Sequence, residues 1–220
     1  KILLSRISVV FASGQTQKEL LKALKYNGEI IETHGVGIIN KPRNALSQSN
    51  FSGKFIYVGR LVEIKNVQML VNIFNGLPSF QLTIVGTGEL FAELKASANI
   101  NIKFVGTVKN ADIGKMLKQH DIFILPSKYE PWGLVAEEAI YHGLPILLSE
   151  ACGVASILSK NPACLLFKPT NEEDLTKIIS KIDAEKHYDL CTYTGPEAIN
   201  YKDTLQIASY QLTHQPVLNL

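Results

Sequence analysis

The chain has 220 residues, of which 46% are hydrophobic and 19% charged, and its formal net charge is +2. This composition is typical of a globular protein of one or two domains and excludes an intrinsically disordered chain. No basic run is dense enough to indicate a nucleic-acid-binding track, and no apolar stretch approaches the length of a membrane span. The opening segment, KILLSRISVVFAS, is not typical of a signal peptide, because Arg6 interrupts its apolar residues.

Cysteine and histidine spacing argues against a disulfide framework and against a metal site. The three cysteines, Cys152, Cys164 and Cys191, are far apart and form no CxxC pair. We therefore expect reduced thiols and a cytoplasmic protein. The five histidines show no metal-ligand spacing either, and we predict no metal site and no cofactor.

The first part of the chain predicts a small strand–helix–strand unit. Residues 7–13 read as a strand, residues 16–26 as an amphipathic helix, and residues 29–40 as a strand followed by a turn. Residues 41–52 are polar and contain Pro, Ser and Asn, which is typical of a linker. Two or three elements cannot bury a core of their own, so residues 1–40 are expected to belong to a second, partial unit.

From residue 53 to about residue 182, strands and helices alternate. The predicted strands are residues 54–58, 80–85, 102–105, 121–126, 145–149 and 164–167, and the predicted helices between and after them include residues 66–75, 88–97, 110–120 and 174–182. Thr170 and Glu173 are expected to form a capping box before the last of these helices. The strands are apolar runs rather than alternating ones, which predicts an α/β fold, a Rossmann-like parallel sheet with helices on both faces.

Two carboxylates follow the strand-like run HDIFILPS. Glu130 lies in the loop after it, and Glu138 lies on the helix-like stretch that Gly143 ends. Ligands of open α/β sheets bind at the carboxyl ends of the strands, where helix N-termini present free N–H groups. A carboxylate at this edge suits sugar or ribose hydroxyls, and the N–H groups suit phosphate.

The segment EPWGLVAEEAIYHGLP resembles the donor-site signature of the group 1 (family four) glycosyltransferases, which have the GT-B fold. The family pattern is a glutamate, seven residues and a second glutamate, with an aromatic–glycine pair after the first. The resemblance implies that Glu138 binds the nucleotide ribose and that Glu130 lies by the transferred sugar. It also implies that the N–H groups of four consecutive residues face the sugar and phosphate, namely Trp132, Gly133, Leu134 and Val135. Glu137 points about 100° away from Glu138 on a helix and is expected to lie at the surface.

Three further segments match the same family. VGRLVEIKN resembles its Gly-Arg-Leu…Lys motif, so Gly59, Arg60 and Lys65 are expected at the donor diphosphate. IVGTGEL places Gly86 and Gly88 at a strand-to-helix turn that helps to shape the donor pocket. By resemblance, the backbone of Val108 contacts the nucleotide base.

The resemblance also implies an activity and a domain plan. The reaction is transfer of a sugar from a nucleotide-diphosphate donor to the hydroxyl of a glycan or lipid-linked acceptor, with retention and without a required metal. Residues 1–40 would end the N-terminal, acceptor-side domain, most of which lies outside this chain. Residues 41–52 would be the linker, residues 53–182 the C-terminal nucleotide-sugar-binding domain, and residues 183–220 helices that cross back. Bacterial surface-glycan assembly is the commonest setting of such proteins, and peripheral contact with the inner face of the membrane through the missing domain stays open.

Three alternatives remain at the level of sequence. A sugar-nucleotide epimerase also uses the GT-B fold, although its site would need acids from both domains. A non-catalytic nucleotide-sugar-binding module fits the same motifs. An NAD-dependent oxidoreductase would share the parallel sheet, but the third glycine of its fingerprint is replaced by Phe91, and the Arg60–Lys65 pair argues against it.

Overall fold

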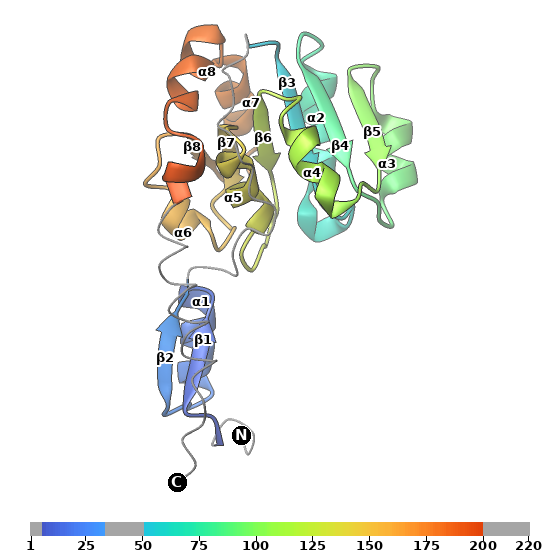
Figure 1. Cartoon of the computed structure of the whole chain (residues 1–220). Coiled ribbons are helices and arrows are strands. Elements are labelled where there is room, and N and C mark those ends of the chain that lie inside the picture. The colour runs from blue at the N-terminus through green and yellow to red at the C-terminus, as the bar shows by residue number, and fades with distance from the viewer. Residues whose placement is uncertain (1–5, 34–50, 200–220) are drawn as a thin grey trace.

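The computed structural model describes residues 6–33 and 51–199, which form two parallel β-sheets (Figure 1). The smaller sheet pairs β1 (Val9–Ala12) with β2 (Glu29–Glu32), and α1 (Gln15–Ala23) connects them. This is the predicted strand–helix–strand unit. The rest of its predicted last segment and most of the predicted linker lie outside the described residues.

The larger sheet has six parallel strands in the order β5-β4-β3-β6-β7-β8. Every strand predicted between residues 54 and 167 is present in it. Their bounds are β3 (Lys54–Val58), β4 (Gln81–Val85), β5 (Ile102–Gly106), β6 (Ile122–Leu125), β7 (Ile146–Ser149) and β8 (Cys164–Phe167).

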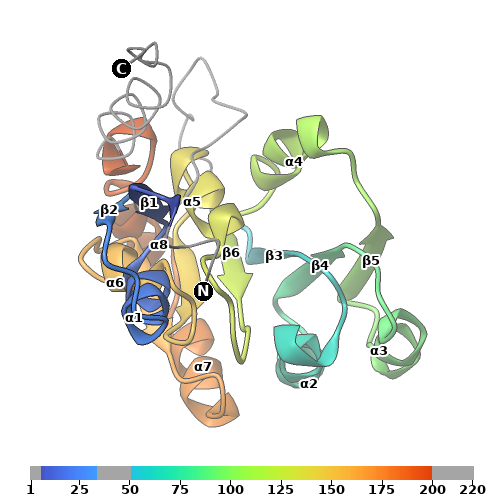
Figure 2. The ribbon, with the colours of Figure 1, turned by 90° about the horizontal axis from the view of Figure 1, so that it is seen from below.

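Helices cover both faces of this sheet. The helices after β3 and β4 and the first helix after β8 lie on one face, and those after β5 and β6 lie on the other (Figure 2). In chain order the helices are α2 (Val67–Asn75), α3 (Phe91–Ser97), α4 (Asn110–Leu117), α5 (Leu134–Tyr141), α6 (Ala155–Leu158), α7 (Glu172–Ser180) and α8 (Ala184–Cys191). The 3-10 helices η2 (Glu63–Lys65) and η3 (Pro196–Ile199) complete the described elements.

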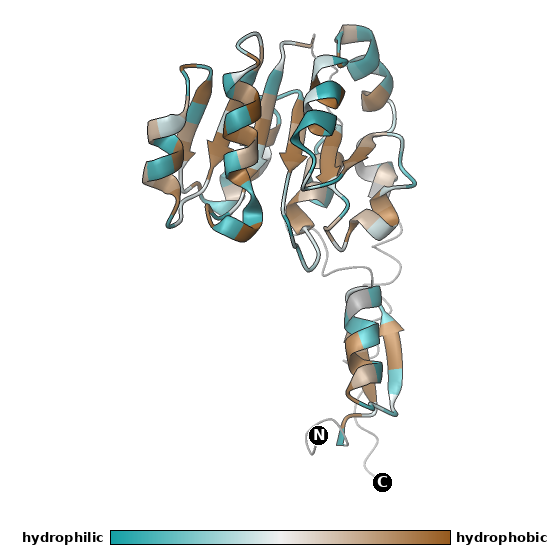
Figure 3. Cartoon of the chain, turned by 180° about the vertical axis from the view of Figure 1, so that it is seen from behind, coloured by the Kyte–Doolittle hydropathy of each residue, from teal (hydrophilic) through white to brown (hydrophobic). Residues whose placement is uncertain are grey.

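The two-sided cover explains why the strands are apolar throughout rather than alternating. All four residues of β6 and all four of β7 are buried. Figure 3 shows the strands of the large sheet as predominantly hydrophobic, whereas the helices carry hydrophilic residues toward solvent. The predicted Rossmann-like parallel sheet with helices on both faces is therefore confirmed.

The strand order reverses between β3 and β6, and the region at the carboxyl ends of these two strands is called the β3–β6 crevice below. From β3 the chain moves outward through β4 to β5, and from β6 it moves outward the other way through β7 to β8. The helix α2 after β3 and the helix α5 after β6 lie on opposite faces (Figure 2), and the loops that lead to them meet at the carboxyl ends of the strands, where the Lys128 N–H donates to the Ile64 carbonyl at 2.9 Å. Such a switch point, at the carboxyl ends of the strands, is where open α/β sheets bind ligands.

Some local predictions were wrong or incomplete. The N-cap of α7 is Asn171, whose side chain accepts from the Asp174 N–H at 3.0 Å, so the capping box predicted at Thr170 does not start this helix. The short helix α6 was not predicted. Of the C-terminal helices expected after residue 183, α8 and η3 are described, and residues 200–220 lie outside the described residues.

Across residues 6–33 and 51–199, every helix is too short or too polar to span a bilayer.

Candidate nucleotide-sugar site

The predicted cation Lys65 and the predicted carboxylate Glu130 meet at the β3–β6 crevice. Lys65 ends η2, just after β3, and Glu130 lies in the loop after β6. Their side chains form an ion pair in which Lys65 Nζ donates to Glu130 Oε2. The side chains are 13% and 17% exposed, so the pair is largely removed from water. The attraction within such a pair is less screened by water than in a surface pair, but desolvation opposes it, so the main consequence is that loss of either partner leaves the other charge uncompensated.

Arg60 lies in the same loop after β3, five residues before Lys65, and is exposed. Its carbonyl oxygen accepts a hydrogen bond of 2.9 Å from the hydroxyl of Tyr57, a fully buried residue of β3. Burial, with the charge of Glu130 as a second cause, holds the pKa of Tyr57 well above its usual range, so the hydroxyl stays a neutral donor. Sequence reasoning missed Tyr57. The available signal was a tyrosine in an aliphatic strand two residues before Gly59.

The glycines of the site allow two backbone segments to touch. The Gly59 N–H donates to the Val85 carbonyl at 3.0 Å, and the Leu61 N–H donates to the Thr87 carbonyl at 2.9 Å. Gly86 has φ +131°, and a Cβ built on it would collide with the Gly59 carbonyl oxygen. The Gly86 turn therefore aligns the loop that carries Arg60 with the loop after β4.

Val108 lies farther along the same edge, in the loop after β5. Its side chain is half-buried and packs against the core at the site where the base contact is expected. The base contact itself stays a prediction.

The loop from Glu130 to Gly133 is held by backbone hydrogen bonds to the segment after β7. The Glu130 N–H donates to the Ala151 carbonyl at 3.3 Å, and the Glu130 carbonyl accepts from the Gly153 N–H at 2.9 Å. The Trp132 carbonyl accepts from the Val154 N–H, also at 2.9 Å. Gly133 then adopts φ +99° and starts α5, so the first N–H groups of this helix, from Leu134 and Val135 onward, begin at the crevice.

The expectation that Glu137 lies at the surface is wrong. Its exposed fraction is 0%, and its Oε2 accepts a 2.7 Å hydrogen bond from the indole Nε1 of Trp132, whereas Glu138 is half-buried. The helical-wheel argument failed because α5 has no wide solvent face. It packs against β6, β7, α4 and η3, and a residue 100° from Glu138 still points into the protein.

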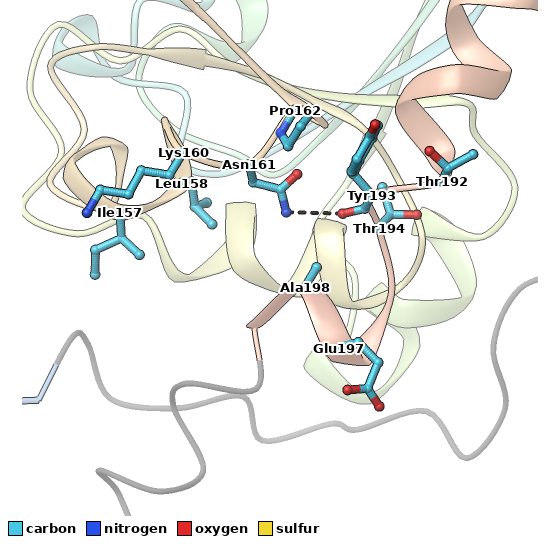
Figure 4. A pocket seen from close by; sticks show the side chains of 10 residues that line it. All are labelled: Ile157, Leu158, Lys160, Asn161, Pro162, Thr192, Tyr193, Thr194, Glu197 and Ala198. Carbon is cyan, nitrogen blue, oxygen red and sulfur yellow. Dashed lines mark hydrogen bonds between the residues drawn. The ribbon is translucent and has the colours of Figure 1, made fainter.

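One cavity lies beside the loop after β6, and another lies away from the predicted site residues. The first, of about 400 Å³, adjoins the loop of residues 130–133, which is called the donor loop below after the resemblance, and is lined in part by Tyr129, Glu130 and Cys152. Burial, and secondarily Glu130, raises the pKa of the Cys152 thiol to about 12, so this thiol is protonated at neutral pH. A second cavity of about 500 Å³ lies between α6 and the α8–η3 segment, where Asn161 Nδ2 donates to the Tyr193 carbonyl at 3.0 Å (Figure 4). None of the predicted site residues lines it.

Within the described residues, no three His, Cys, Asp or Glu side chains gather where they could hold a metal ion. Metal independence of the reaction stays a prediction.

A family model described as "Glycosyl transferases group 1" matches residues 39–200, a span that contains every predicted site residue. The chain belongs to the group 1 glycosyltransferases. It is 30% identical over 128 residues to the sulfoquinovosyl transferase SQD2 of Arabidopsis thaliana, covering 56% of this chain and 25% of that protein. It is 32% identical over 131 residues to the O-antigen biosynthesis glycosyltransferase WbnH of Escherichia coli, covering 59% of this chain and 37% of that protein. The group 1 chain thus spans well under half the length of these relatives.

Solved structures give the same fold. Anabaena HepE, determined in complex with UDP and glucose, superposes with a TM-score of 0.77 at 19% identity, covering 94% of this chain and 63% of that one. The architecture is that of the GT-B glycosyltransferases, as the resemblance in sequence implied.

Proposed function

We propose that this group 1 chain binds a nucleotide-diphosphate sugar and, within its whole protein, transfers the sugar to an acceptor hydroxyl in glycan biosynthesis. We further propose that transfer retains the configuration at the sugar carbon and needs no metal. Family membership, the transferase names of the relatives and the UDP and glucose bound to HepE support this proposal.

The observation that carries the proposal is the Lys65–Glu130 ion pair at the β3–β6 crevice. A shielded cation and a shielded carboxylate, side by side, suit the two ends of one ligand. The cation suits the phosphates, and the carboxylate suits the hydroxyl groups of a sugar. Arg60, in the loop after β3, and the start of α5, just after the Glu130 loop, add further positive character.

The chemistry requires stabilisation of the charge that gathers on the departing diphosphate. Arg60 can grip phosphate oxygens in a fork, Lys65 can act as a point charge, and the free N–H groups of α5 can donate hydrogen bonds. Lys65, which is paired with Glu130, and the N–H groups of α5 are held in place before the reaction, and such preorganised electrostatics is usually the largest catalytic contribution, worth several kcal/mol.

The remaining contacts follow the order of the ligand along the sheet edge. In this proposal Glu138 binds the ribose, the backbone of Val108 meets the base, and Glu130 holds the sugar hydroxyls next to the oxocarbenium-like centre. Because Glu130 already neutralises Lys65, the incoming diphosphate shares an ammonium group that is oriented rather than free. The acceptor is expected to bind on the side of the N-terminal domain.

The first test is calorimetry of the 220-residue chain with UDP, GDP and ADP. The proposal expects one of the three to bind clearly better than the others, and no binding of any of them at millimolar concentration would contradict it.

The second test uses the full-length protein and a radiolabelled sugar donor of the preferred base. Label in a new glycoside indicates transfer, label in an altered sugar nucleotide indicates epimerisation, and unchanged donor indicates a binding module. NMR of the product bond reports retention or inversion, and activity after dialysis against EDTA tests the need for a metal.

A further inference from the structure

Glu137 is a buried carboxylate on α5, and the other buried residues of this helix are apolar. On α5 the neighbouring buried residues are Ala136, Ala139 and Ile140, and Glu137 is as fully buried as they are. A carboxylate is removed from water at a high free-energy cost unless hydrogen bonds compensate for it. An apolar side chain would fill the same place without that cost. The carboxylate therefore indicates that a neighbouring hydrogen-bond donor needs an acceptor at this position.

This donor is the indole N–H of Trp132, a residue that is 8% exposed. Its Nε1–H donates to Glu137 Oε2 at 2.7 Å, five residues along the chain. The indole N–H of a buried tryptophan needs an acceptor, and a carboxylate acceptor makes the stronger, charge-assisted bond.

The hydrogen bond adds a second anchor to the donor loop. The backbone bonds to residues 151–154 hold the loop along one side, and the Trp132–Glu137 bond ties it to the helix that it precedes. The far edge of the indole faces the β1–α1 turn, since a Cβ built on Gly14 would lie 2.8 Å from Trp132 Cζ3. Trp132 is thus fixed between α5 and the small N-terminal unit, with Glu130 two residues before it.

We propose that Glu137 is a positioning residue of the donor site, which acts through the Trp132 indole to hold the 130–133 loop and the start of α5. The expected effect of Glu137 on ligand affinity rests on the proposed function, whereas its expected effect on the 130–133 loop does not.

Four variants separate this role from plain stability. Glu137→Gln keeps an oxygen acceptor of the same shape, and Glu137→Leu removes it. Trp132→Phe keeps a ring but removes the N–H donor. Ile179→Ala opens a cavity at a buried site of α7 and serves as the control for lost stability away from the loop.

Amide hydrogen exchange over residues 130–135 of the unliganded chain is the deciding measurement. Glu137→Leu and Trp132→Phe should each raise exchange there by about tenfold, the effect of losing one buried hydrogen bond to a charged group. The double variant should show clearly less than the sum of the two single effects, because both changes remove the same Trp132–Glu137 bond. Glu137→Gln and Ile179→Ala should resemble the unmodified chain in this segment. If Glu137→Leu does not fold, the comparison of Trp132→Phe with Glu137→Gln decides the question.

Titration with UDP, GDP and ADP then tests the consequence for ligand binding. The preferred nucleotide should bind about tenfold more weakly to the Glu137→Leu and Trp132→Phe chains, and unchanged to Glu137→Gln and Ile179→Ala. Trp132 is the only tryptophan of the chain, so its emission reports on the loop in the other variants. Normal loop protection in both deleterious variants, or additive effects in the double variant, would overturn the positioning role. Failure of the unmodified chain to bind any nucleotide would instead overturn the proposed function, and the exchange data would still decide the role of Glu137.

Discussion

At the scale of single residues, Lys65 and Glu130 are two predicted site residues whose charged side chains form an ion pair. They lie 65 positions apart in the chain and belong to two separate motifs. Their pairing means that neither can be changed without altering the surroundings of the other. A substitution at either position leaves the other charge without its partner, and its effect must be interpreted with that in mind.

Arg60 and Lys65 are expected to recognise the diphosphate and not the nucleoside. Arg60→Ala and Lys65→Met should each weaken binding of the preferred nucleoside diphosphate by at least about tenfold, since a charge-assisted hydrogen bond contributes ~1.5–3 kcal/mol. Calorimetry with the diphosphate and with the free nucleoside measures the difference. Lys118→Ala, at an exposed cation at the end of α4, is the control and should bind as the unmodified chain does. Equal weakening of diphosphate and nucleoside would show that the two cations are not phosphate ligands.

Glu130 and Glu138 should separate turnover from nucleotide binding. Glu130→Gln removes the charge that pairs with Lys65, so free nucleotide should bind as well as before or somewhat more tightly, while turnover of the full-length protein falls. Glu138→Ala should weaken donor and free nucleotide alike, because both carry the ribose. Steady-state kinetics and calorimetry on the same samples measure both effects. Loss of nucleotide binding in Glu130→Gln together with a silent Glu138→Ala would mean that the two roles must be exchanged.

At the scale of elements, the candidate site depends on how α5 begins. Gly133 places the chain in the left-handed region, which turns the loop after β6 into a helix within one residue. Asn66, also left-handed with φ 57°, performs a comparable task before α2. Its side-chain amide donates to the carbonyls of Pro126 at 3.2 Å and Pro169 at 2.9 Å, and so joins the loops after β6 and β8 to the start of α2.

Gly133→Ala should disturb the site in two ways that a matched control can separate. A side chain at φ +99° is strained by about 1 kcal/mol or more, and the new Cβ would also lie 3.3 Å from Glu130 Cγ and from Leu125 Cδ2. Gly195→Ala has the same strain at φ +101° but meets nothing within 4 Å. Urea unfolding should show a larger loss of stability for Gly133→Ala, and only this variant should lose nucleotide affinity. Equal losses in both variants would mean that the contacts at Gly133 are unimportant.

At the scale of the whole molecule, the candidate site lies at the carboxyl ends of the strands, and a separate set of hydrogen bonds lies at the amino end of β6. At the amino end of β6, Asp121 Oδ2 accepts from the Ser52 N–H at 2.9 Å and from the Lys54 N–H at 2.8 Å. His187 Nε2 of α8 donates to the Asp121 carbonyl at 3.0 Å. The entry of the chain into the large sheet and its late helix α8 are thus tied together on the edge opposite the candidate site.

The buried thiols should make the fold sensitive to alkaline pH. Burial raises the pKa of Cys152 and of Cys164 from 9.0 to about 12, so the folded state holds these protons more tightly than the unfolded state does. Their contribution to stability is therefore complete below about pH 9 and is lost progressively as the pH rises toward 12. At about pH 10 the loss should be about 1 kcal/mol for each thiol.

Urea unfolding under reducing conditions, at about pH 7 and about pH 10, measures this loss. The Cys152→Ala, Cys164→Ala double variant should lose ~2–3 kcal/mol less between the two pH values than the unmodified chain, which retains both thiols. Tyr57 is common to both proteins, so its own titration cancels in the comparison. An equal loss in both would place the alkaline sensitivity elsewhere.

The sequence by itself determined the strands of the large sheet, the order of strand and helix, and the place of each motif at a strand end. These features are local, because an apolar run, a glycine turn and a polar loop can each be recognised from a few consecutive residues. Helix caps were harder to predict, because Thr170 and Asn171 are both suitable capping residues at adjacent positions and only Asn171 caps α7.

Only the tertiary structure decided which motifs meet. The adjacency of β3 and β6 pairs Lys65 with Glu130 and brings the loops after these two strands together. It also decided that Glu137 is buried, because α5 is enclosed by neighbours from distant parts of the chain, and a single helix cannot reveal which of its faces they will cover.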